Sequence, residues 1–184
     1  MKPAIVVIDM QNDFFEDEPL KGIKASLVAK INCLTAFARD KKIPVIWVRQ
    51  EYKADMSDIN LNDKKTGRRI TVEGTPGAEI LDELDRSEDE TVIVKKRYSA
   101  FFGTSFDKVI DGLGVDTLVL CGVNTHACVR TTLIDAFQRD IEVIVAKDCV
   151  GSWNPAHHDI SLEYFEKNMS VRVLSNSEIE KVFG

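Results

Sequence analysis

The sequence predicts an α/β protein of three layers, α/β/α, with a six-stranded parallel sheet between helices. Short β-branched runs that are apolar throughout recur along the chain, as in strands that are covered on both faces. Longer segments with apolar residues at helical spacing lie between these runs, which is typical of a parallel sheet with helices on both sides. Unusual polar residues directly follow several runs, where folds of this class bind their ligands.

Six runs are predicted to form the strands: Ala4–Ile8, Val45–Val48, Val92–Val94, Thr117–Leu120, Val143–Ala146 and Val171–Leu174. Helices are predicted at Ser26–Lys41, Ala78–Leu84, Ser105–Leu113, Ala127–Arg139 and Pro155–Asn168, with a short last helix after Asn176. In the first helix Leu27, Ile31 and Leu34 recur at helical spacing, and Ser26 is the expected N-cap.

The composition indicates one domain that spans residues 1–184. With 44% hydrophobic and 29% charged residues, a chain of 184 residues can bury one sizeable core. Its net charge of −6 argues against nucleic acid and anionic membranes as partners, because both require a basic face. The sequence has no signal-peptide pattern and no run long enough to span a membrane. We therefore expect a cytoplasmic protein that acts on a small-molecule substrate.

The segment Gln50–Pro76 is the one irregular stretch, polar and rich in charged residues such as Asp63, Arg68 and Arg69. A lid over a site, a contact between subunits and a solvated loop all fit this composition. The sequence leaves these three interpretations open.

A carboxylate follows the first strand directly, in the motif Asp9-Met10-Gln11-Asn12-Asp13-Phe14. Because Asp9 abuts a buried run, it would be partly desolvated and could serve as a general base with a raised pKa. The alternative is that Asp9 or Asp13 only caps the turn that follows.

The third strand leads into a segment of small and aromatic residues, Lys95-Lys96-Arg97-Tyr98-Ser99-Ala100-Phe101-Phe102-Gly103-Thr104. Such residues between a strand and a helix fit a tight turn that lines a pocket. Lysines at the end of a strand are usually solvated, so position alone assigns Lys95 no role.

The fourth strand leads into Cys121-Gly122-Val123-Asn124-Thr125-His126-Ala127-Cys128-Val129-Arg130. Cys128 falls in the first turn of the predicted helix, where free backbone amides and the helix dipole stabilise a thiolate and can bind an oxyanion. Cys33 and Cys121 lie within apolar patterns and are interpreted as packing residues, while Cys149 also follows a strand and is the rival thiol. The four cysteines form no CxxC pair, which favours free thiols in a reducing compartment.

Taken together, these motifs resemble those of the isochorismatase-like cysteine hydrolases, the family that includes nicotinamidases and N-carbamoylsarcosine amidase. The resemblance spans nearly the whole chain and rests on four elements in the family's order. They are Asp9 through Phe14, then Glu73-Gly74-Thr75-Pro76-Gly77, then Lys95 with Ser99-Ala100-Phe101, and then Gly122 through Val129. The resemblance implies the strand order 3-2-1-4-5-6.

The resemblance also implies a catalytic triad, which falls on Asp9, Lys95 and Cys128. It implies an oxyanion hole formed by the backbone amides of Asn124 and Cys128, next to a cis peptide bond between Val123 and Asn124. In the implied strand order the third strand is two places from the first, roughly 10 Å away, so Lys95 must bend inward to reach Asp9.

Aromatic side chains near the strand ends are candidates for substrate binding. They are Phe14, Tyr98, Phe101 and Trp153, with Trp47 as a further candidate inside its strand. Each has the alternative of packing in the core, above all Trp47.

The sequence departs from the metal-dependent nicotinamidases at their metal ligands. The corresponding positions hold Gln50, Tyr52 and Ile70, and no histidine precedes His126. We therefore expect no bound metal and no cofactor, because a zinc or iron site cannot be built from these side chains.

The expected function is hydrolysis of a small carboxamide, ureido or carbamoyl substrate through an acyl intermediate on Cys128. Within the family, a vinyl-ether hydrolase of the isochorismatase type and a nicotinamidase are the alternatives. Outside it, a ligand-binding protein on the same fold and a thiol redox protein stay open. We also expect a homo-oligomer, either a dimer or a tetramer.

Overall fold

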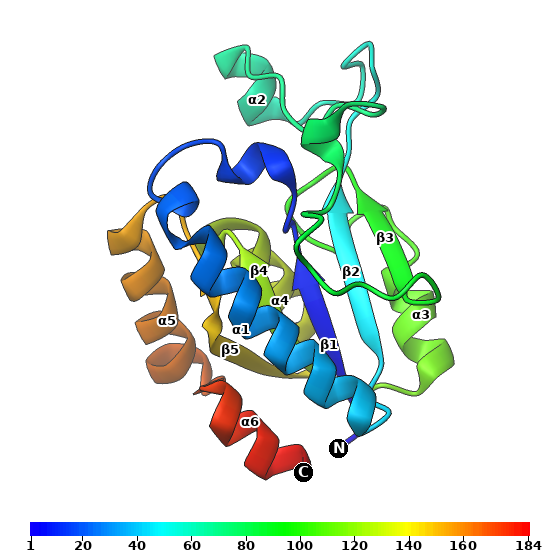
Figure 1. The fold of residues 1–184 in the computed structure, drawn as a ribbon, viewed down its shortest axis with the longest axis vertical. Coiled ribbons are helices and arrows are strands. Elements are labelled where there is room, and N and C mark those ends of the chain that lie inside the picture. Colours follow the sequence, from blue (N-terminus) through cyan, green and yellow to red (C-terminus); the bar gives the residue numbers. More distant parts are fainter.

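The computed structural model describes residues 1–184 and contains one sheet of six parallel strands in the order β3-β2-β1-β4-β5-β6 (Figure 1). The strands are β1 (Pro3–Ile8), β2 (Val45–Gln50), β3 (Thr91–Lys95), β4 (Thr117–Val123), β5 (Glu142–Gly151) and β6 (Arg172–Leu174). The fold class and the strand order that the sequence and its resemblance predicted are confirmed.

The helices alternate with these strands along the chain. They are α1 (Leu20–Asp40), α2 (Leu61–Thr66), α3 (Phe106–Leu113), α4 (Arg130–Phe137), α5 (Pro155–Met169) and α6 (Asn176–Phe183). Two short 3-10 turns, η1 (Asn12–Phe15) and η2 (Pro76–Ala78), and a π-helical turn, η3 (Thr125–Val129), lie at the ends of strands or in loops.

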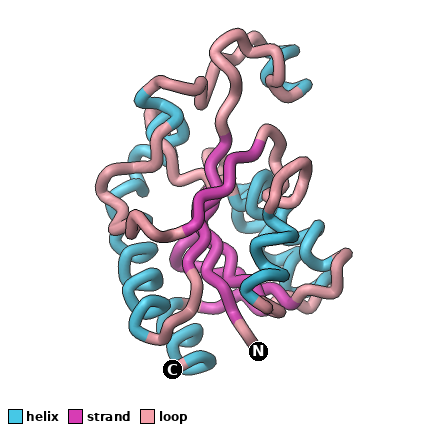
Figure 2. The backbone as a smooth tube through the Cα atoms, turned by 90° about the vertical axis from the view of Figure 1, so that its right-hand side faces the viewer, coloured by secondary structure: helices cyan, strands magenta, loops and turns pink.

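Two separate hydrophobic clusters form the core, one on each face of the sheet. Figure 2 shows helices on both sides of the strands. Helices α1 and α6 cover the face to which Ile5 and Val7 of β1 point, whereas α3, α4 and α5 cover the face to which Val6 and Ile8 point. Because successive strand residues point to opposite faces, burial on both faces requires every residue of β1 to be apolar. This is the physical origin of the continuous apolar runs.

Helix α1 begins six positions before the predicted start, so Ser26 lies inside the helix and is not its N-cap. The helix follows Pro19 directly, and its apolar face includes Leu20 as well as Leu27 and Ile31. A proline fixes backbone geometry compatible with a helix start, which explains the earlier beginning.

The predicted helix Ala78–Leu84 is absent. Instead, Leu81 N donates to Met10 O at 2.9 Å and Gln11 forms an isolated antiparallel bridge with Ile80. A seven-residue segment gains little from helix formation alone, so pairing with the end of β1 determines its structure. The segment predicted to be irregular, Gln50–Pro76, contains the short helix α2, which stands apart from the sheet at the top of Figure 1.

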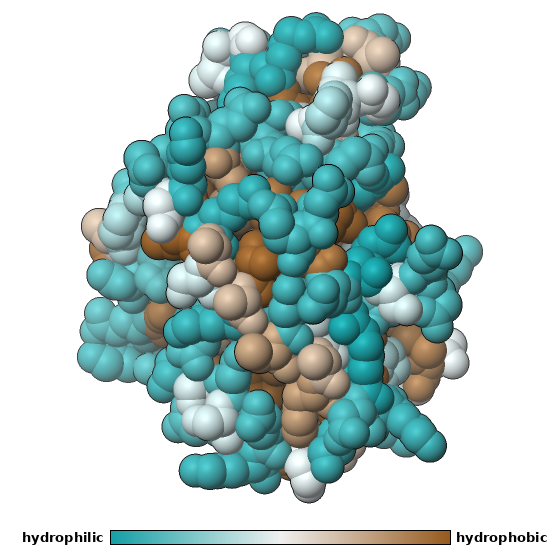
Figure 3. Space-filling view, in the orientation of Figure 1, coloured by the Kyte–Doolittle hydropathy of each residue, from teal (hydrophilic) through white to brown (hydrophobic).

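Hydrophilic side chains cover most of the face in Figure 3, and the hydrophobic ones visible there concentrate in its middle. None of the helices combines the length and the apolar composition that crossing a bilayer requires.

Candidate active site

Three side chains that are far apart in the sequence meet at the carboxyl end of the sheet. Lys95 Nζ lies 2.8 Å from Asp9 Oδ2 and 3.5 Å from Cys128 Sγ. Asp9 follows β1, Lys95 ends β3, and Cys128 follows β4 in η3. All three side chains are buried, with exposed fractions of 4% or less.

The structure explains how Lys95 reaches Asp9 across the strand between them. Lys95 pairs in register with Gln50 of β2, so its side chain extends past the end of β2 toward β1. Asp9 has left the strand by this point, with a φ of 52° and with its N–H donating to Val48 O at 2.8 Å. A long, flexible lysine side chain can span this gap, whereas a short cation could not.

The three groups change one another's protonation. Burial raises the pKa of Asp9, although the Lys95 ammonium acts against this shift. Burial disfavours the ammonium of Lys95, but the charges of Asp9 and Cys128 outweigh burial and raise the pKa of Lys95. Burial and the Asp9 carboxylate together raise the pKa of the Cys128 thiol.

These shifts favour a neutral thiol beside the paired Asp9 and Lys95. The position of Cys128 at a helix start predicted stabilisation of its thiolate, and burial acts in the opposite direction. Burial and the nearby carboxylate outweigh the effect of the lysine and raise the pKa of the thiol. A carboxylate with a raised pKa next to such a thiol is suited to accept its proton.

The course of the chain from β4 to Cys128 depends on Gly122. Gly122 has a φ of 105° and pairs with Ile8 at the end of β1. A Cβ atom at this position would overlap the carbonyl oxygen of Ile8 and lie 2.7 Å from Ile8 N. Only glycine fits, so it lets the backbone that leads to Cys128 pass directly beside the strand that leads to Asp9.

The peptide bond between Val123 and Asn124 is cis. The Asn124 N–H donates to no other backbone group, and the Asn124 side chain accepts a hydrogen bond from Trp153 N at 2.9 Å. Cys128 lies in η3, directly before α4. A free N–H near the first turn of a helix is suited to binding a negatively charged oxygen.

The rest of the motif that begins at Asp9 holds the surrounding loops in place. Gln11 donates from Nε2 to Gln50 O and Ala78 O and accepts from Gln50 N, so it joins three segments. Asp13 accepts a hydrogen bond from Thr71 N, and a Cβ atom at Gly77 would overlap its carboxylate. These contacts explain why glycine follows Pro76 and why the two motifs occur together.

A cleft of about 460 Å³ opens above Cys128. Three of the predicted substrate-binding aromatics, Phe14, Tyr98 and Trp153, line it. Phe101 does not: it lies in the core, with its ring 4.8 Å from Phe106 and beneath the guanidinium of Arg139. Trp47 is also buried in the core, and its indole N–H donates to Glu90.

Polar residues to which the sequence assigned no role in substrate binding also line the cleft. They are Gln50, Asn62, Asp63, Arg68, His126, Arg130 and Thr131, next to the expected oxyanion-hole residue Asn124. His126 also lies at the cleft, and its Nδ1 is 2.7 Å from Ser152 Oγ. The charge-rich composition of Gln50–Pro76 was the available signal for Asp63 and Arg68.

The three positions that correspond to metal ligands in metal-dependent nicotinamidases are buried. Gln50 donates to Thr71 at 3.2 Å, and the hydroxyl of Tyr52 is bonded to Asn60 and Asp63. Ile70 is a buried hydrocarbon side chain. No three His, Cys, Asp or Glu side chains are grouped as metal ligands would be.

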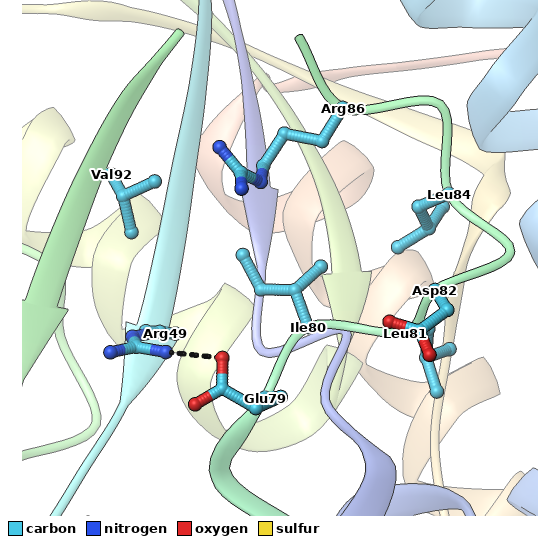
Figure 4. Close-up of a pocket in the computed structure, with 8 residues that line it drawn as sticks. All are labelled: Arg49, Glu79, Ile80, Leu81, Asp82, Leu84, Arg86 and Val92. Atoms are coloured by element: carbon cyan, nitrogen blue, oxygen red, sulfur yellow. Dashed lines mark hydrogen bonds and ion pairs between the residues drawn. The ribbon is translucent and has the colours of Figure 1, made fainter. Parts of the chain in front are cut away.

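A second hollow, of about 470 Å³, lies between β2, β3 and the loop 79–86 (Figure 4). The guanidinium of Arg49 there is paired with Glu79 at 3.0 Å and with Glu51 at 2.8 Å. No thiol, histidine or lysine lines it. The two hollows have similar volumes, so the reactive residues that line the cleft above Cys128 identify it as the candidate active site.

Comparison with known proteins agrees with this geometry. Residues 3–178 match the isochorismatase domain family. The chain is 36% identical over 169 residues to a probable inactive nicotinamidase of Arabidopsis thaliana, covering 86% of this chain and 85% of that one. It is 33% identical to the maleamate amidohydrolase of Pseudomonas putida, covering 88% of this chain and 78% of that one.

Among solved structures, the N-carbamoylsarcosine amidase from Thermoplasma acidophilum superposes with a TM-score of 0.83 and 31% identity. The match covers 98% of this chain and 99% of that chain. A family model that matches nearly the whole chain, together with relatives above 30% identity, establishes the relationship. The chain belongs to the isochorismatase family of hydrolases.

Proposed function

We propose that this protein is a metal-independent cysteine amidohydrolase that cleaves a small carboxamide or ureido substrate. The observation that carries the proposal is the contact of Lys95 Nζ with both Asp9 and Cys128 at the floor of a cleft. A base and a nucleophile that both contact one cation are the groups that covalent acyl transfer requires.

In the first half of the reaction, the Asp9 carboxylate takes the Sγ proton as Sγ bonds to the substrate's carbonyl carbon. Lys95 stabilises the negative charge that develops on sulfur, and the N–H groups of Asn124 and Cys128 hold the oxyanion. The C–N bond then breaks as Asp9 returns the proton to the leaving nitrogen, which leaves a thioester on Cys128.

In the second half, Asp9 removes a proton from water, whose oxygen attacks the thioester carbon. The C–S bond breaks, the thiol regains a proton, and the acid product leaves. Phe14, Tyr98 and Trp153 would bind the substrate's apolar surface from the walls of the cleft.

The relatives' names support amide chemistry but do not select one substrate. Maleamate and N-carbamoylsarcosine contain an amide and a ureido group, respectively. The Arabidopsis relative is named a probable inactive nicotinamidase, which makes catalysis itself the first point to test. A vinyl-ether hydrolase is the alternative within the family, and it would need no acyl intermediate on Cys128.

Incubation with maleamate, N-carbamoylsarcosine, nicotinamide and isochorismate, followed by ammonia and product assays, tests the proposal. We expect ammonia release from at least one amide or ureido compound and a thioester adduct on Cys128 in quenched samples analysed by mass spectrometry. Cys128→Ala should abolish both, whereas Cys33→Ala, at an exposed thiol, should not. Turnover of isochorismate alone, without an adduct, would overturn the proposal.

A further inference from the structure

One oxygen of a buried carboxylate at the cleft has no hydrogen-bond donor within the chain. Asp63 is 4% exposed and lines the cleft above Cys128. Its Oδ2 accepts hydrogen bonds from Asn60 Nδ2 at 2.6 Å and from the hydroxyl of Tyr52 at 3.3 Å. Its Oδ1 accepts no hydrogen bond from any protein group.

The N-cap of α2 fixes the orientation of this carboxylate. Asp63 N donates to Asn60 Oδ1 at 2.9 Å, which leaves Asn60 Nδ2 to donate to Asp63 Oδ2 and to the hydroxyl oxygen of Tyr52. The Tyr52 hydroxyl then has its own hydrogen to donate to the same Oδ2. The unpaired side-chain nitrogen and oxygen atoms that are sealed from solvent are Asp9 Oδ1 and Arg49 Nε. Oδ1 of Asp63 is therefore not sealed, and it is reached from the cleft.

No cation neutralises Asp63. Arg68 and Arg130 line the same cleft, yet neither forms an ion pair with it, and Lys95 is paired with Asp9. A buried carboxylate without a cationic partner is costly unless hydrogen bonds compensate it. Since the protein supplies donors to one oxygen alone, the other oxygen is left for a donor that enters the cleft.

Asp63 and Cys128 both influence one aromatic side chain of the cleft. Burial raises the pKa of the Tyr98 hydroxyl, and Asp63 and Cys128 add to this shift. Tyr98 also lines the cleft, so it lies near both groups. A small molecule that packs against Tyr98 is thus within reach of the nucleophile and of Asp63 Oδ1.

The charges of the cleft favour a neutral donor over an ammonium group. Two guanidinium groups, those of Arg68 and Arg130, line the cleft against the one carboxylate of Asp63. A cationic ligand would be repelled by both guanidinium groups, whereas a neutral amide N–H is not. An amide N–H that donates to a carboxylate still forms a charge-assisted hydrogen bond.

We propose that Asp63 determines substrate specificity, because its Oδ1 accepts a hydrogen bond from a neutral N–H group of the substrate, remote from the bond that Cys128 attacks. The substrates that fit are small neutral compounds with a second amide, such as N-substituted diamides of short dicarboxylic acids. This inference rests on the proposed function and deepens it. A substrate without the N–H would displace water from the cleft and leave Oδ1 unpaired, and this penalty provides the selectivity.

N-methylsuccinamide and methyl succinamate test the inference, because they match in size, carry one primary amide each and differ by NH against O at the remote end. The wild-type enzyme should prefer N-methylsuccinamide by roughly 10- to 100-fold in kcat/KM, measured as ammonia release. Asp63→Asn keeps an acceptor for Asn60 and Tyr52 but turns an NH2 group toward the cleft. It should remove the preference by raising KM for N-methylsuccinamide and leave methyl succinamate within about twofold.

The matched control is Asp55→Asn, at an exposed carboxylate of the same segment that does not line the cleft. This variant should keep the full preference for N-methylsuccinamide. Equal use of the two compounds by the wild type would overturn the inference while leaving the proposed function intact.

4-Aminobutanamide tests the charge of the donor, since it carries an ammonium group at the remote end. It should be a poorer substrate than N-methylsuccinamide. A preference for 4-aminobutanamide that Asp63→Asn abolishes would overturn the assignment of a neutral donor and indicate a cationic substrate.

A binding measurement separates the two proposals if none of these compounds is hydrolysed. Alkylation of Cys128 by iodoacetamide is followed in the presence of N-methylsuccinamide or methyl succinamate. N-methylsuccinamide should protect Cys128 at lower concentration, and Asp63→Asn should remove that difference. Protection of this kind without any turnover would support the Asp63 site and refute the amidohydrolase. Equal protection by both compounds would refute the Asp63 site.

Discussion

Lys95 Nζ lies 2.8 Å from Asp9 Oδ2, although the strands that carry these residues are separated by β2. Both side chains are almost completely buried, so neither charge is screened by water. Breaking such a pair by removing one partner leaves an uncompensated charge and typically costs about 3–5 kcal/mol. Loss of either partner alone should therefore destabilise the end of the sheet, and both charges also affect the pKa of Cys128.

Asp9→Asn and Lys95→Met should have opposite effects on the reactivity of Cys128. Asp9→Asn removes a carboxylate that raises the pKa of the thiol, so alkylation by iodoacetamide at pH 8 should accelerate. Lys95→Met removes the cation that opposes this shift, so alkylation should slow. Both variants should lose turnover, because each removes a group that the proposed reaction uses. Rates are measured by peptide mapping.

Buried Cys121 and Cys149 report on structural damage in the same experiment. If a variant unfolds, their labelling will rise together with that of Cys128. A change in the same direction for both variants, with Cys121 and Cys149 unaffected, would contradict the roles assigned to Asp9 and Lys95.

The acid limb of the pH dependence of kcat/KM should lie at higher pH than the ordinary pKa of an aspartate predicts. Asp9 must be ionised to accept the thiol proton, so activity is lost as pH falls through its pKa. Because burial raises that pKa, the loss should begin above the ordinary value of 3.8. The pKa of Cys128 and that of Lys95 are also raised, so the alkaline limb should lie above 9.0, the ordinary value for a thiol.

Steady-state rates from about pH 4 to about pH 10, with a substrate that does not titrate in this range, would check both limbs. A plateau that extends to the acid end of this range would show that the Asp9 carboxyl is not the base. An alkaline limb below the ordinary thiol value of 9.0 would show that Cys128 ionises more readily than its burial allows.

Position at the end of a strand singled out Asp9, and position at a helix start singled out Cys128, because the ends of parallel strands meet at one edge of a sheet. Lys95 was assigned by the family resemblance, since its position alone gave it no role. The motif after the fourth strand also contains Gly122, but the close contact of Gly122 with Ile8 depends on the pairing of β4 with β1. What the sequence alone could not give is the path of Lys95 across β2. That path depends on sheet order and on the left-handed backbone conformation of Asp9.

The cleft walls were harder to predict. Phe14 and Phe101 both follow strands, yet only Phe14 lines the cleft, because Phe101 packs against Phe106 under α3. Periodicity cannot distinguish an aromatic residue that faces solvent from one that faces a helix. Arg68 reaches the cleft through contacts among Tyr52, Asn60 and Asp63, which are tertiary and leave no local pattern.

Removal of divalent metal should leave activity unchanged. Gln50, Tyr52 and Ile70 offer an amide, a phenol and a hydrocarbon where metal-dependent nicotinamidases have ligands, and burial raises the pKa of Tyr52 to about 12, which disfavours a phenolate ligand. Protein dialysed against EDTA should retain its turnover, and elemental analysis of untreated protein should find no stoichiometric zinc or iron. Bound metal whose removal abolishes turnover would refute this prediction.

Gly122 and Gly112 form a matched pair for testing how the two strands bring Asp9 and Cys128 together. Alanine at Gly122 would require a side chain at a φ of 105° and would force its Cβ into the backbone of Ile8. We expect the free energy of unfolding to fall by about 2–4 kcal/mol, from strain and overpacking combined. Gly112 lies inside α3, and a Cβ atom there would meet no other atom within 4 Å, so Gly112→Ala should raise the free energy of unfolding by about 0.5–1 kcal/mol.

Gly122→Ala and Gly112→Ala should also differ in their effects on activity, because only Gly122 lies between the base and the nucleophile. Ile8 precedes Asp9, and Gly122 leads through η3 to Cys128, so separating β1 from β4 at this point moves the base away from the nucleophile. Gly122→Ala should therefore lower kcat even under conditions in which it is fully folded, whereas Gly112→Ala should keep the wild-type kcat. Urea denaturation and turnover of the same preparations would measure both quantities. A Gly122→Ala variant with wild-type stability and kcat would show that β1 and β4 can separate without disturbing the site.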